Sequence, residues 1–201
     1  DQTPKSWMKN SCVWYSQVLT RKLGMQKFQS YITKFNYGNM DLSGDKGKNN
    51  GLTNAWLSSS LEISSIEQIA FLGKLLNNTL PVSRNTHEMT KNILFVEELP
   101  GGWKLYGKTG SGVLLSPDRT RKLKIQHGWF IGWIEKDGRV IAFSNHISDL
   151  LDFLYCFFCA SSEILKSRAT VLLISFTTSS IIGCNLVYSL RTDLRGHLII
   201  L

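Results

Sequence analysis

Residues 102–109 read GWKLYGKT and match the phosphate-loop pattern G-x-x-x-x-G-K-[ST], with Gly102, Gly107, Lys108 and Thr109 in register. A phosphate loop follows a buried strand, wraps the anion with backbone N–H groups and opens a helix. Here the four residues between the glycines alternate like a strand, and the glycines and proline downstream disfavour a helix. The sequence therefore predicts a strand at this point and no nucleotide site.

The same strand contains Lys108-Thr109-Gly110, which suits a different anion. On a strand beside a cleft, a lysine cation and a threonine hydroxyl can both bind a carboxylate. Gly110 lets a ligand approach the backbone closely, and the N–H group of Ser111 can polarise a carbonyl. This is the K-T-G element of the serine enzymes that recognise penicillin, so a carboxylate-binding strand is predicted.

Three further short motifs precede this strand, and their order is informative. They are S-x-V at Ser11-Cys12-Val13, Y-G-N at Tyr37-Gly38-Asn39, and W-L at Trp56-Leu57. Read together with K-T-G, the set resembles the class D, oxacillin-hydrolysing β-lactamases, and so do DQTPKSWM at the beginning and GWFIGW at 128–133. The resemblance covers residues 1–149. Classes with S-D-N or S-x-N fit less well, because Val13 offers no polar group.

The resemblance implies catalytic roles for Ser11, Lys108 and Trp56. Ser11 would relay a proton to the lactam nitrogen as the ring opens, and Lys108 would keep Ser11 polarised. Lys108 would also attract the substrate carboxylate together with Thr109, while the N–H of Ser111 would form half of the oxyanion hole. Trp56 would donate its indole N–H to a carboxylated lysine, the general base of the family. No other cofactor is implied.

The remaining implied contacts are with the β-lactam substrate, through Val13, Tyr37, Gly38, Asn39, Leu57 and Gly110 in addition to Thr109 and Ser111. Taken singly, these residues have ordinary structural explanations. Ser11 suits a helix N-cap, Trp56 suits core packing, and Tyr37-Gly38-Asn39 suits a turn. His127 and His146 are interpreted as surface residues at strand ends, and no metal site is predicted.

The family places its nucleophile and its base lysine in an S-x-x-K motif at the start of a helix. Two strings match, Ser6 to Lys9 and Ser43 to Lys46. The first is only five residues before Ser11, and the second falls in a loop rich in Gly and Asn. We therefore expect the true motif and the carboxylated lysine to precede Asp1, and the chain to be inactive by itself.

Composition is that of a packed protein of one domain, or one domain with an appendage: 201 residues, 43% hydrophobic, net charge +8. The only tight basic cluster, RTRKLK at 119–124, is interpreted as a solvated loop, and no nucleic-acid partner is predicted. CFFC at 156–159 has redox spacing but lacks the flanking strand and helix that such sites need.

Periodicity predicts helices first and an antiparallel meander after them. Helices are expected over 11–24, 25–35, 64–78 and 81–93, with a loop at 37–51 and strands at 93–99 and 103–115. Asp137-Gly138 lies between two β-rich runs and predicts a hairpin over 128–147. The expected fold is α/β, an incomplete transpeptidase-like fold of serine β-lactamases and penicillin-binding proteins.

The last 52 residues differ in kind from those before them. Residues 150–201 form an atypical hydrophobic tail, interpreted as the product of a shifted reading frame, and 169–190 carry no charge over a length that could span a bilayer. The domain is therefore expected to cover 1–149. The resemblance implies a bacterial protein, periplasmic or secreted, with β-lactam antibiotics as partners and a homodimer as one possible assembly. A β-lactam-sensing receptor domain without turnover is the alternative function.

Overall fold

The computed structural model describes residues 1–149, 169–177, 188–192 and 198–200. The chain divides into two compact units. The first unit comprises residues 1–94 and 112–123, and the second comprises residues 95–111 and those from 124 onward.

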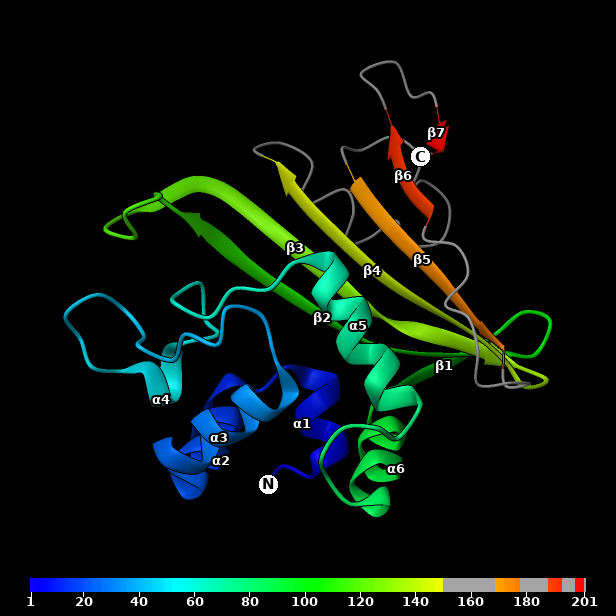
Figure 1. Cartoon of the computed structure of the whole chain (residues 1–201), viewed down its shortest axis with the longest axis horizontal. Helices are drawn as coiled ribbons and strands as arrows, with labels where there is room; N and C mark the ends of the chain where they lie inside the picture. Colours follow the sequence, from blue (N-terminus) through cyan, green and yellow to red (C-terminus); the bar gives the residue numbers. More distant parts are fainter. Residues whose placement is uncertain (150–168, 178–187, 193–197, 201) are drawn as a thin grey trace. The chain divides into compact units, whose positions relative to one another are not determined.

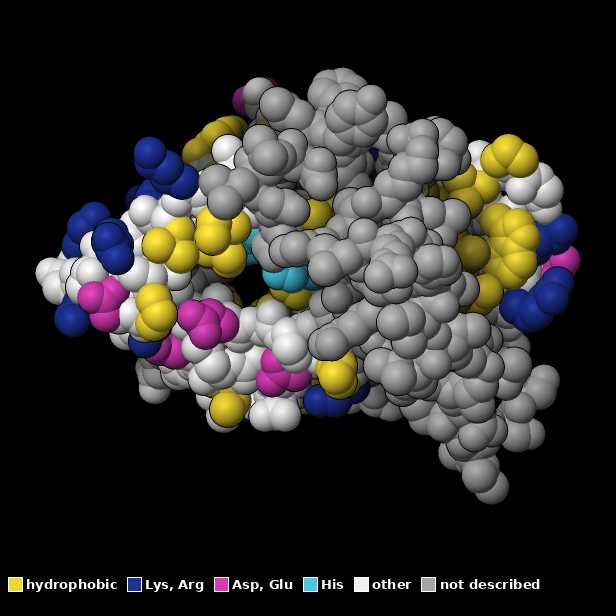
Figure 2. Space-filling model, turned by 90° about the horizontal axis from the view of Figure 1, so that it is seen from above, with side chains coloured by type: hydrophobic (Ala, Val, Ile, Leu, Met, Phe, Trp, Pro, Cys, Tyr) yellow, Lys and Arg dark blue, Asp and Glu magenta, His cyan; other side chains and the backbone are white. Residues whose placement is uncertain are grey.

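Charged side chains project from the surface on the face shown in Figure 2. On that face Lys and Arg side chains are separated by acidic and uncharged residues rather than joined in one stripe. The absence of a nucleic-acid partner stays a prediction.

The first unit is helical (Figure 1). Its helices are α1 (Pro4–Asn10), α2 (Val13–Leu23), α3 (Met25–Phe35), α4 (Gly51–Asn54), α5 (Ser65–Leu76) and α6 (Arg84–Ile93). The four longer helices are those that periodicity predicts. The prediction missed α1, although Thr3 caps this helix and Pro4 begins it, which is a recognisable signal.

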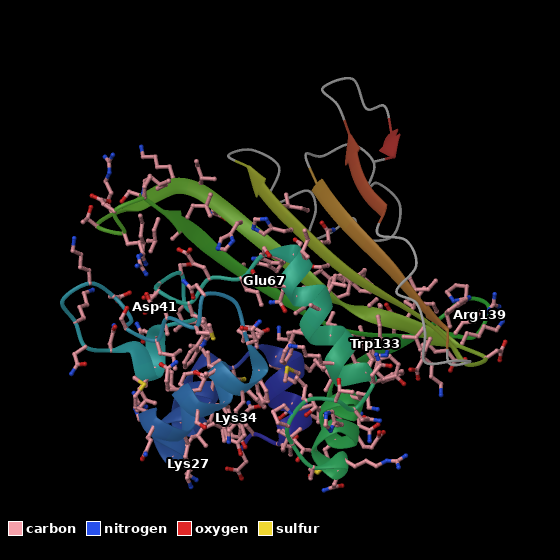
Figure 3. The ribbon with its side chains drawn as sticks, viewed as in Figure 1. Lys27, Lys34, Asp41, Glu67, Trp133 and Arg139 are labelled. Atoms are coloured by element: carbon pink, nitrogen blue, oxygen red, sulfur yellow. The ribbon has the colours of Figure 1, made fainter. Side chains whose placement is uncertain are left out.

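Helix α5 begins with the predicted capping box. The Ser64 hydroxyl accepts a hydrogen bond from the Glu67 N–H at 3.3 Å, and the Glu67 carboxylate accepts one from the Ser64 N–H at 2.8 Å. Glu67 is labelled at the beginning of the helix in Figure 3. The helix buries one face through Ile69, Leu72 and Leu75, which supplies most of its stabilisation.

A second apolar cluster joins α3 to the loop that follows it. Ile32, Leu42 and Ala55 are buried, and Phe28, Tyr37, Met40 and Leu61 pack against them. The loop at 37–51 is therefore held by side chains of its own as well as by hydrogen bonds, and it ends where α4 begins.

The second unit is built on an antiparallel meander. Its strands are β1 (Phe95–Leu99), β2 (Trp103–Leu115), β3 (Lys122–Lys136), β4 (Arg139–Asp149), β5 (Ala169–Thr177), β6 (Tyr188–Thr192) and β7 (Leu198–Ile200). They lie in sequence order in one seven-stranded sheet (Figure 1). The end of β2, the start of β3 and their connection belong to the first unit. The predicted order of helices followed by a meander is confirmed.

The hairpin of β3 and β4 turns where the sequence predicts it. Asp137 and Gly138 have φ angles of 49° and 72°, which the primed two-residue turn requires. Pairing runs without interruption from Lys136 opposite Arg139 to Gln126 opposite Asp149. Each side chain of the hairpin is thereby assigned to one face of the sheet.

The hydrophobic tail does not form a spanning helix where the structure describes it. Residues 169–177 form β5, which pairs with β4 from Ala169 opposite Ile147 to Thr177 opposite Arg139. Among the described residues no helix is long and apolar enough to cross a membrane. The expectation for 169–190 as a whole stays a prediction, because 178–187 lie outside the described residues. Residues 150–168 and 178–187 lie outside the described part, and the boundary at residue 149 stays a prediction.

Burial on α5 predicts a large difference between two substitutions on the same helix. Leu72 is 4% exposed and Ile66 is 69% exposed. We expect Leu72→Ala to lower the free energy of unfolding by about 2–5 kcal/mol, because it removes buried methyl groups and leaves a cavity. Ile66→Ala is the matched control and should change it by about 0.5 kcal/mol or less. Urea denaturation followed by circular dichroism measures both, and equal effects would contradict the assigned core face.

Candidate functional site

Ser11 lies at the junction of α1 and α2 and does not cap α2. The N-cap of α2 is Cys12, which makes no side-chain capping bond, so the interpretation of Ser11 as an N-cap is wrong. Ser11 instead ends α1 in the left-handed conformation, with φ 49° and ψ 45°. Such a conformation costs a residue other than glycine on the order of 1–3 kcal/mol and is concentrated at functional sites.

The junction is braced on both sides. The indole N–H of Trp7 on α1 donates to the Ser16 hydroxyl on α2 at 2.9 Å, and the Trp7 ring contacts Tyr15 with centroids 5.4 Å apart. Val13 begins α2 and is 44% exposed. The S-x-V motif is therefore presented on a fixed corner of the first unit.

Asn39 connects three segments of the first unit. Its amide nitrogen donates to the Ser60 carbonyl at 2.8 Å, and its amide oxygen accepts from the N–H groups of Asp41 and Glu62, each at 3.1 Å. Because the partners lie up to 23 residues away, this one side chain closes the loop that follows Y-G-N.

The other two residues of Y-G-N are also held from within the unit. A Cβ at Gly38 would lie 2.0 Å from the Glu62 carbonyl oxygen, and its φ is +54°, so only glycine fits. The Tyr37 hydroxyl accepts a hydrogen bond from Gln68 at 3.0 Å, and burial raises its pKa. Their predicted contact with substrate stays a prediction, while their structural contribution is evident.

Trp56 packs edge-on against Phe28, with ring centroids 6.0 Å apart. Within the part of the chain that the structure describes, its indole N–H makes no hydrogen bond, and the side chain is half-buried. Leu57 follows it and lines a pocket of the same unit. The packing and the implied donor role are compatible, because the ring face and the N–H are separate parts of the indole.

That pocket was not anticipated from the sequence. It measures about 650 Å³ and lies between the loop at 43–48 and the β2–β3 connection. Five basic side chains line it against two acidic ones, Asp45 and Asp118; the basic ones are Lys46, Lys48, Arg119, Arg121 and Lys122. The basic cluster at 119–124 thus contributes to a concave surface with an excess of positive charge.

Ion pairs and hydrogen bonds hold the walls of this pocket. Arg119 pairs with Asp41 at 3.2 Å, and Asp41 is labelled in Figure 3. Asp45 accepts hydrogen bonds from Asn50 and Ser59, each at 2.9 Å, which lower the pKa of its carboxyl. The pocket wall is therefore ordered by its acidic residues.

The K-T-G residues lie on β2 in the second unit. Lys108 is half-buried, and its ammonium donates to the Thr109 carbonyl at 2.6 Å and approaches the Thr109 hydroxyl at 3.4 Å. Burial lowers the pKa of Lys108. Strand geometry continues through Gly107 and Lys108, as predicted, and no helix begins there as a phosphate loop requires.

The two glycines of this strand are constrained differently. A Cβ at Gly107 would lie 2.7 Å from the Ile131 carbonyl oxygen and 2.8 Å from the Phe130 ring. Among the described residues, a Cβ at Gly110 would meet only the Trp129 Cβ, at an ordinary 3.7 Å. Packing within the unit therefore requires glycine at 107 and leaves room at 110, where close approach by a ligand is the remaining physical reason for glycine.

The structure thus assembles the predicted residues in two groups. Ser11, Val13, Y-G-N and W-L belong to the first unit, and K-T-G with Ser111 belongs to the second. Thr109 and Ser111 are exposed on β2.

Comparison with known proteins identifies the family to which these groups belong. Residues 1–153 match the family described as the penicillin binding protein transpeptidase domain. The chain belongs to this family and, within it, to the class D β-lactamases. Its sequence is 44% identical over 173 residues to β-lactamase OXA-1 of Escherichia coli, covering 86% of this chain and 59% of that protein.

Other relatives agree with this assignment. β-Lactamase OXA-9 of Klebsiella pneumoniae is 45% identical over 142 residues, or 71% of this chain and 52% of that protein. The crystal structure of the class D β-lactamase OXA-427 matches with a TM-score of 0.70 and 47% identity, covering 74% of this chain and 61% of that one. The C-terminal domain of the Bacillus licheniformis BlaR penicillin-receptor matches with a TM-score of 0.64 and 32% identity, covering 75% and 55%.

The predicted family and transpeptidase-like fold are therefore confirmed. The chain spans 59% and 52% of the lengths of the two curated relatives.

The Asn39 contacts predict that the Y-G-N segment stabilises the first unit. Asn39→Ala removes three hydrogen bonds and should lower the free energy of unfolding by about 1–3 kcal/mol. The matched control is Asn92→Ala, because Asn92 is exposed on α6 and makes no side-chain hydrogen bond among the described residues. Thermal and urea unfolding measure both, and an Asn39 variant as stable as the control would contradict the structural role.

Asp118 supplies a prediction on pH. The Ser116 hydroxyl, followed by the Thr120 hydroxyl and N–H, donates to its carboxylate and lowers its pKa to about 2. Since the folded pKa is depressed, this stabilisation is present above the unfolded value of about 3.9 and is lost as pH falls through about 2. Ser116→Ala should move the pKa up toward its ordinary value, as measured by carboxyl carbon NMR. Ser30→Ala is the control, because Ser30 lies on α3 and its side chain makes no hydrogen bond among the described residues. An unchanged Asp118 pKa in Ser116→Ala would refute the assignment.

Proposed function

We propose that this class D chain serves the hydrolysis of the β-lactam amide bond through an acyl-serine, and that it supplies the substrate-binding and proton-relay groups. One observation carries the proposal. Lys108 is a half-buried cation held against Thr109 on an uninterrupted strand, beside a glycine that internal packing does not require.

The proposed chemistry assigns a step to each group. A serine hydroxyl would lose its proton to the carboxylated lysine of the family as its oxygen forms a bond to the lactam carbonyl carbon, while the N–H of Ser111 stabilises the developing oxyanion. The carbon–nitrogen bond then breaks, and the nitrogen takes its proton from Ser11. Lys108 and Thr109 hold the substrate carboxylate throughout, which positions the ring for attack. Water later hydrolyses the acyl-enzyme and releases the open-ring acid.

The remaining residues form the surroundings of this reaction. Trp56 is proposed to donate its indole N–H to the carboxylated lysine of the family, which acts as the general base. Val13, Leu57 and the segment Tyr37-Gly38-Asn39 are proposed to contact the substrate. The internal contacts of Asn39 and Gly38 support this, because a wall must be rigid to orient a ligand.

Neither S-x-x-K string within the chain is assigned as the nucleophile. Ser6 lies on α1, but its hydroxyl takes part in the capping box with Thr3 and donates to Gln2 at 2.8 Å. Ser43 lies in the loop before α4, where no helix brings its hydroxyl and the Lys46 ammonium together. The nucleophile and base are therefore proposed to come from an S-x-x-K motif outside residues 1–201.

A β-lactam sensor is the second candidate function, favoured by the structural match to the BlaR penicillin-receptor domain. The two functions share binding and acylation and differ in deacylation. Rapid release of the open-ring acid supports the enzyme, and a covalent penicillin adduct that persists supports the sensor. Mass spectrometry after mixing with penicillin separates the two outcomes.

A chimaera provides the decisive experiment. The part of β-lactamase OXA-1 that precedes its matched region is joined to this chain, and nitrocefin hydrolysis is measured. Lys108→Ala should lower kcat/KM by about a hundredfold or more, as is usual when a preorganised charge-stabilising group is lost. Lys104→Ala is the matched control, because Lys104 is exposed on the same strand. Equal activity of the Lys108 variant and the control would refute the proposed role.

The cellular context is also proposed from the family. A periplasmic or secreted location and a homodimer are expected for the whole protein. Cell fractionation and analytical ultracentrifugation test them.

A further inference from the structure

His127 and His146 meet across β3 and β4. Their nitrogens Nδ1 and Nε2 are 3.3 Å apart, and the rings lie edge to face with centroids 5.5 Å apart. The interpretation of both as surface residues at strand ends is therefore wrong, since both are half-buried within the sheet. Histidine side chains are visible on the face shown in Figure 2.

The hairpin register explains why the two rings meet. His146 lies opposite Trp129, and His127 is two residues from Trp129 on the same strand. Residues two apart share a face of a sheet, and diagonal neighbours across an antiparallel pair are within reach of ring side chains. Trp129 packs on the His146 ring with centroids 4.2 Å apart, which limits the rotation of that ring. The pair is therefore fixed by the ladder before any ligand binds.

Both rings favour the neutral form. Burial lowers the pKa of His127, and burial together with the charge of His127 lowers the pKa of His146 to about 4. A neutral imidazole has one nitrogen with a free lone pair, which is the form that binds metal ions. At neutral pH no proton has to be displaced from a cationic ring.

The separation of the nitrogens matches a metal chelate. In a tetrahedral zinc site with bonds of about 2.0–2.1 Å, two nitrogen ligands are about 3.4 Å apart. A direct hydrogen bond between the rings would be long at 3.3 Å, compared with a usual distance near about 2.9–3.0 Å. The observed distance therefore suits two nitrogens that share a cation better than it suits a strong bond between them.

We propose that His127 Nδ1 and His146 Nε2 form a two-histidine binding site for a divalent transition-metal ion, Zn²⁺ or Cu²⁺. Imidazole suits both ions, and Cu²⁺ is expected to bind more tightly. The described residues contain no group of three or more His, Cys, Asp or Glu placed to hold a metal, so water completes the coordination. The site is accordingly exchangeable rather than structural.

This site goes beyond β-lactam hydrolysis and does not depend on it. It lies next to the K-T-G strand of the same unit, because Trp129 contacts His146 on one side and approaches Gly110 on the other. Metal binding at the pair would be transmitted to that strand through one side chain.

Calorimetric titration of the 201-residue chain with ZnCl₂ and CuCl₂ tests the proposal. The four cysteines are first alkylated, because thiolates would compete for both ions. We expect one equivalent to bind, and binding to weaken by about tenfold or more in His127→Gln and in His146→Gln, because each loses half of the protein ligands. The double variant should bind at least as weakly as either single variant, since it retains neither protein ligand.

Gln126→Ala is the control, because Gln126 is exposed on β3 beside His127 and offers no imidazole, and it should bind as the unaltered chain does. A second measurement protects the test against variants that fold poorly: nitrogen NMR of the unaltered chain should show the ring signals of His127 and His146 shifting together as Zn²⁺ is added. Ring signals that do not move, or equal affinity in the single variants and the control, would overturn the proposal.

Discussion

The register of the β3–β4 hairpin is the constraint on which the second unit depends. It originates in two residues with positive φ, Asp137 and Gly138, and continues through every pair to Asp149. A slip of one residue would move Trp133 from the interior to the opposite face and separate His146 from Trp129. Trp133 is 1% exposed and stacks on Tyr106 with centroids 4.7 Å apart, so the register also fixes β2 through this contact. The position of the K-T-G strand therefore depends on the Asp137-Gly138 turn, which comes later in the chain.

In the first unit, hydrogen bonds from single polar side chains join segments that are distant in the sequence. In the second unit, backbone pairing between strands joins them. Asn39 and Asp45 each satisfy several donors from distant parts of the chain, and the segments between them contain little regular structure. Apart from Tyr37, Met40 and Leu42, the loop at 37–51 has few apolar side chains to bury, so its order depends on satisfied hydrogen bonds as well. The same acidic residues that order the wall leave the pocket lined by an excess of cations.

Much of the fold could be predicted from local signals. The Ser64–Glu67 capping box, the Asp137-Gly138 turn and the alternation through Lys108 each act within a few residues, and each appears in the structure as expected. The site was predictable only as an ordered set of short motifs, because no single motif distinguishes a catalyst from a cap or a turn. The contacts of Asn39 were not predictable, because Ser60 and Glu62 come close to Asn39 only when the loop between them has folded. The histidine pair could have been predicted from the sequence. Counting outward from the turn places His146 opposite Trp129, and His127 is two residues from Trp129 on the same face.

Ser11 has a consequence for how the chain can evolve. Its left-handed backbone would be relieved by glycine and better tolerated by asparagine, so folding alone favours residues other than serine there. Replacements that raise stability at this corner would discard the hydroxyl, and selection for stability and selection for chemistry therefore oppose each other at one position.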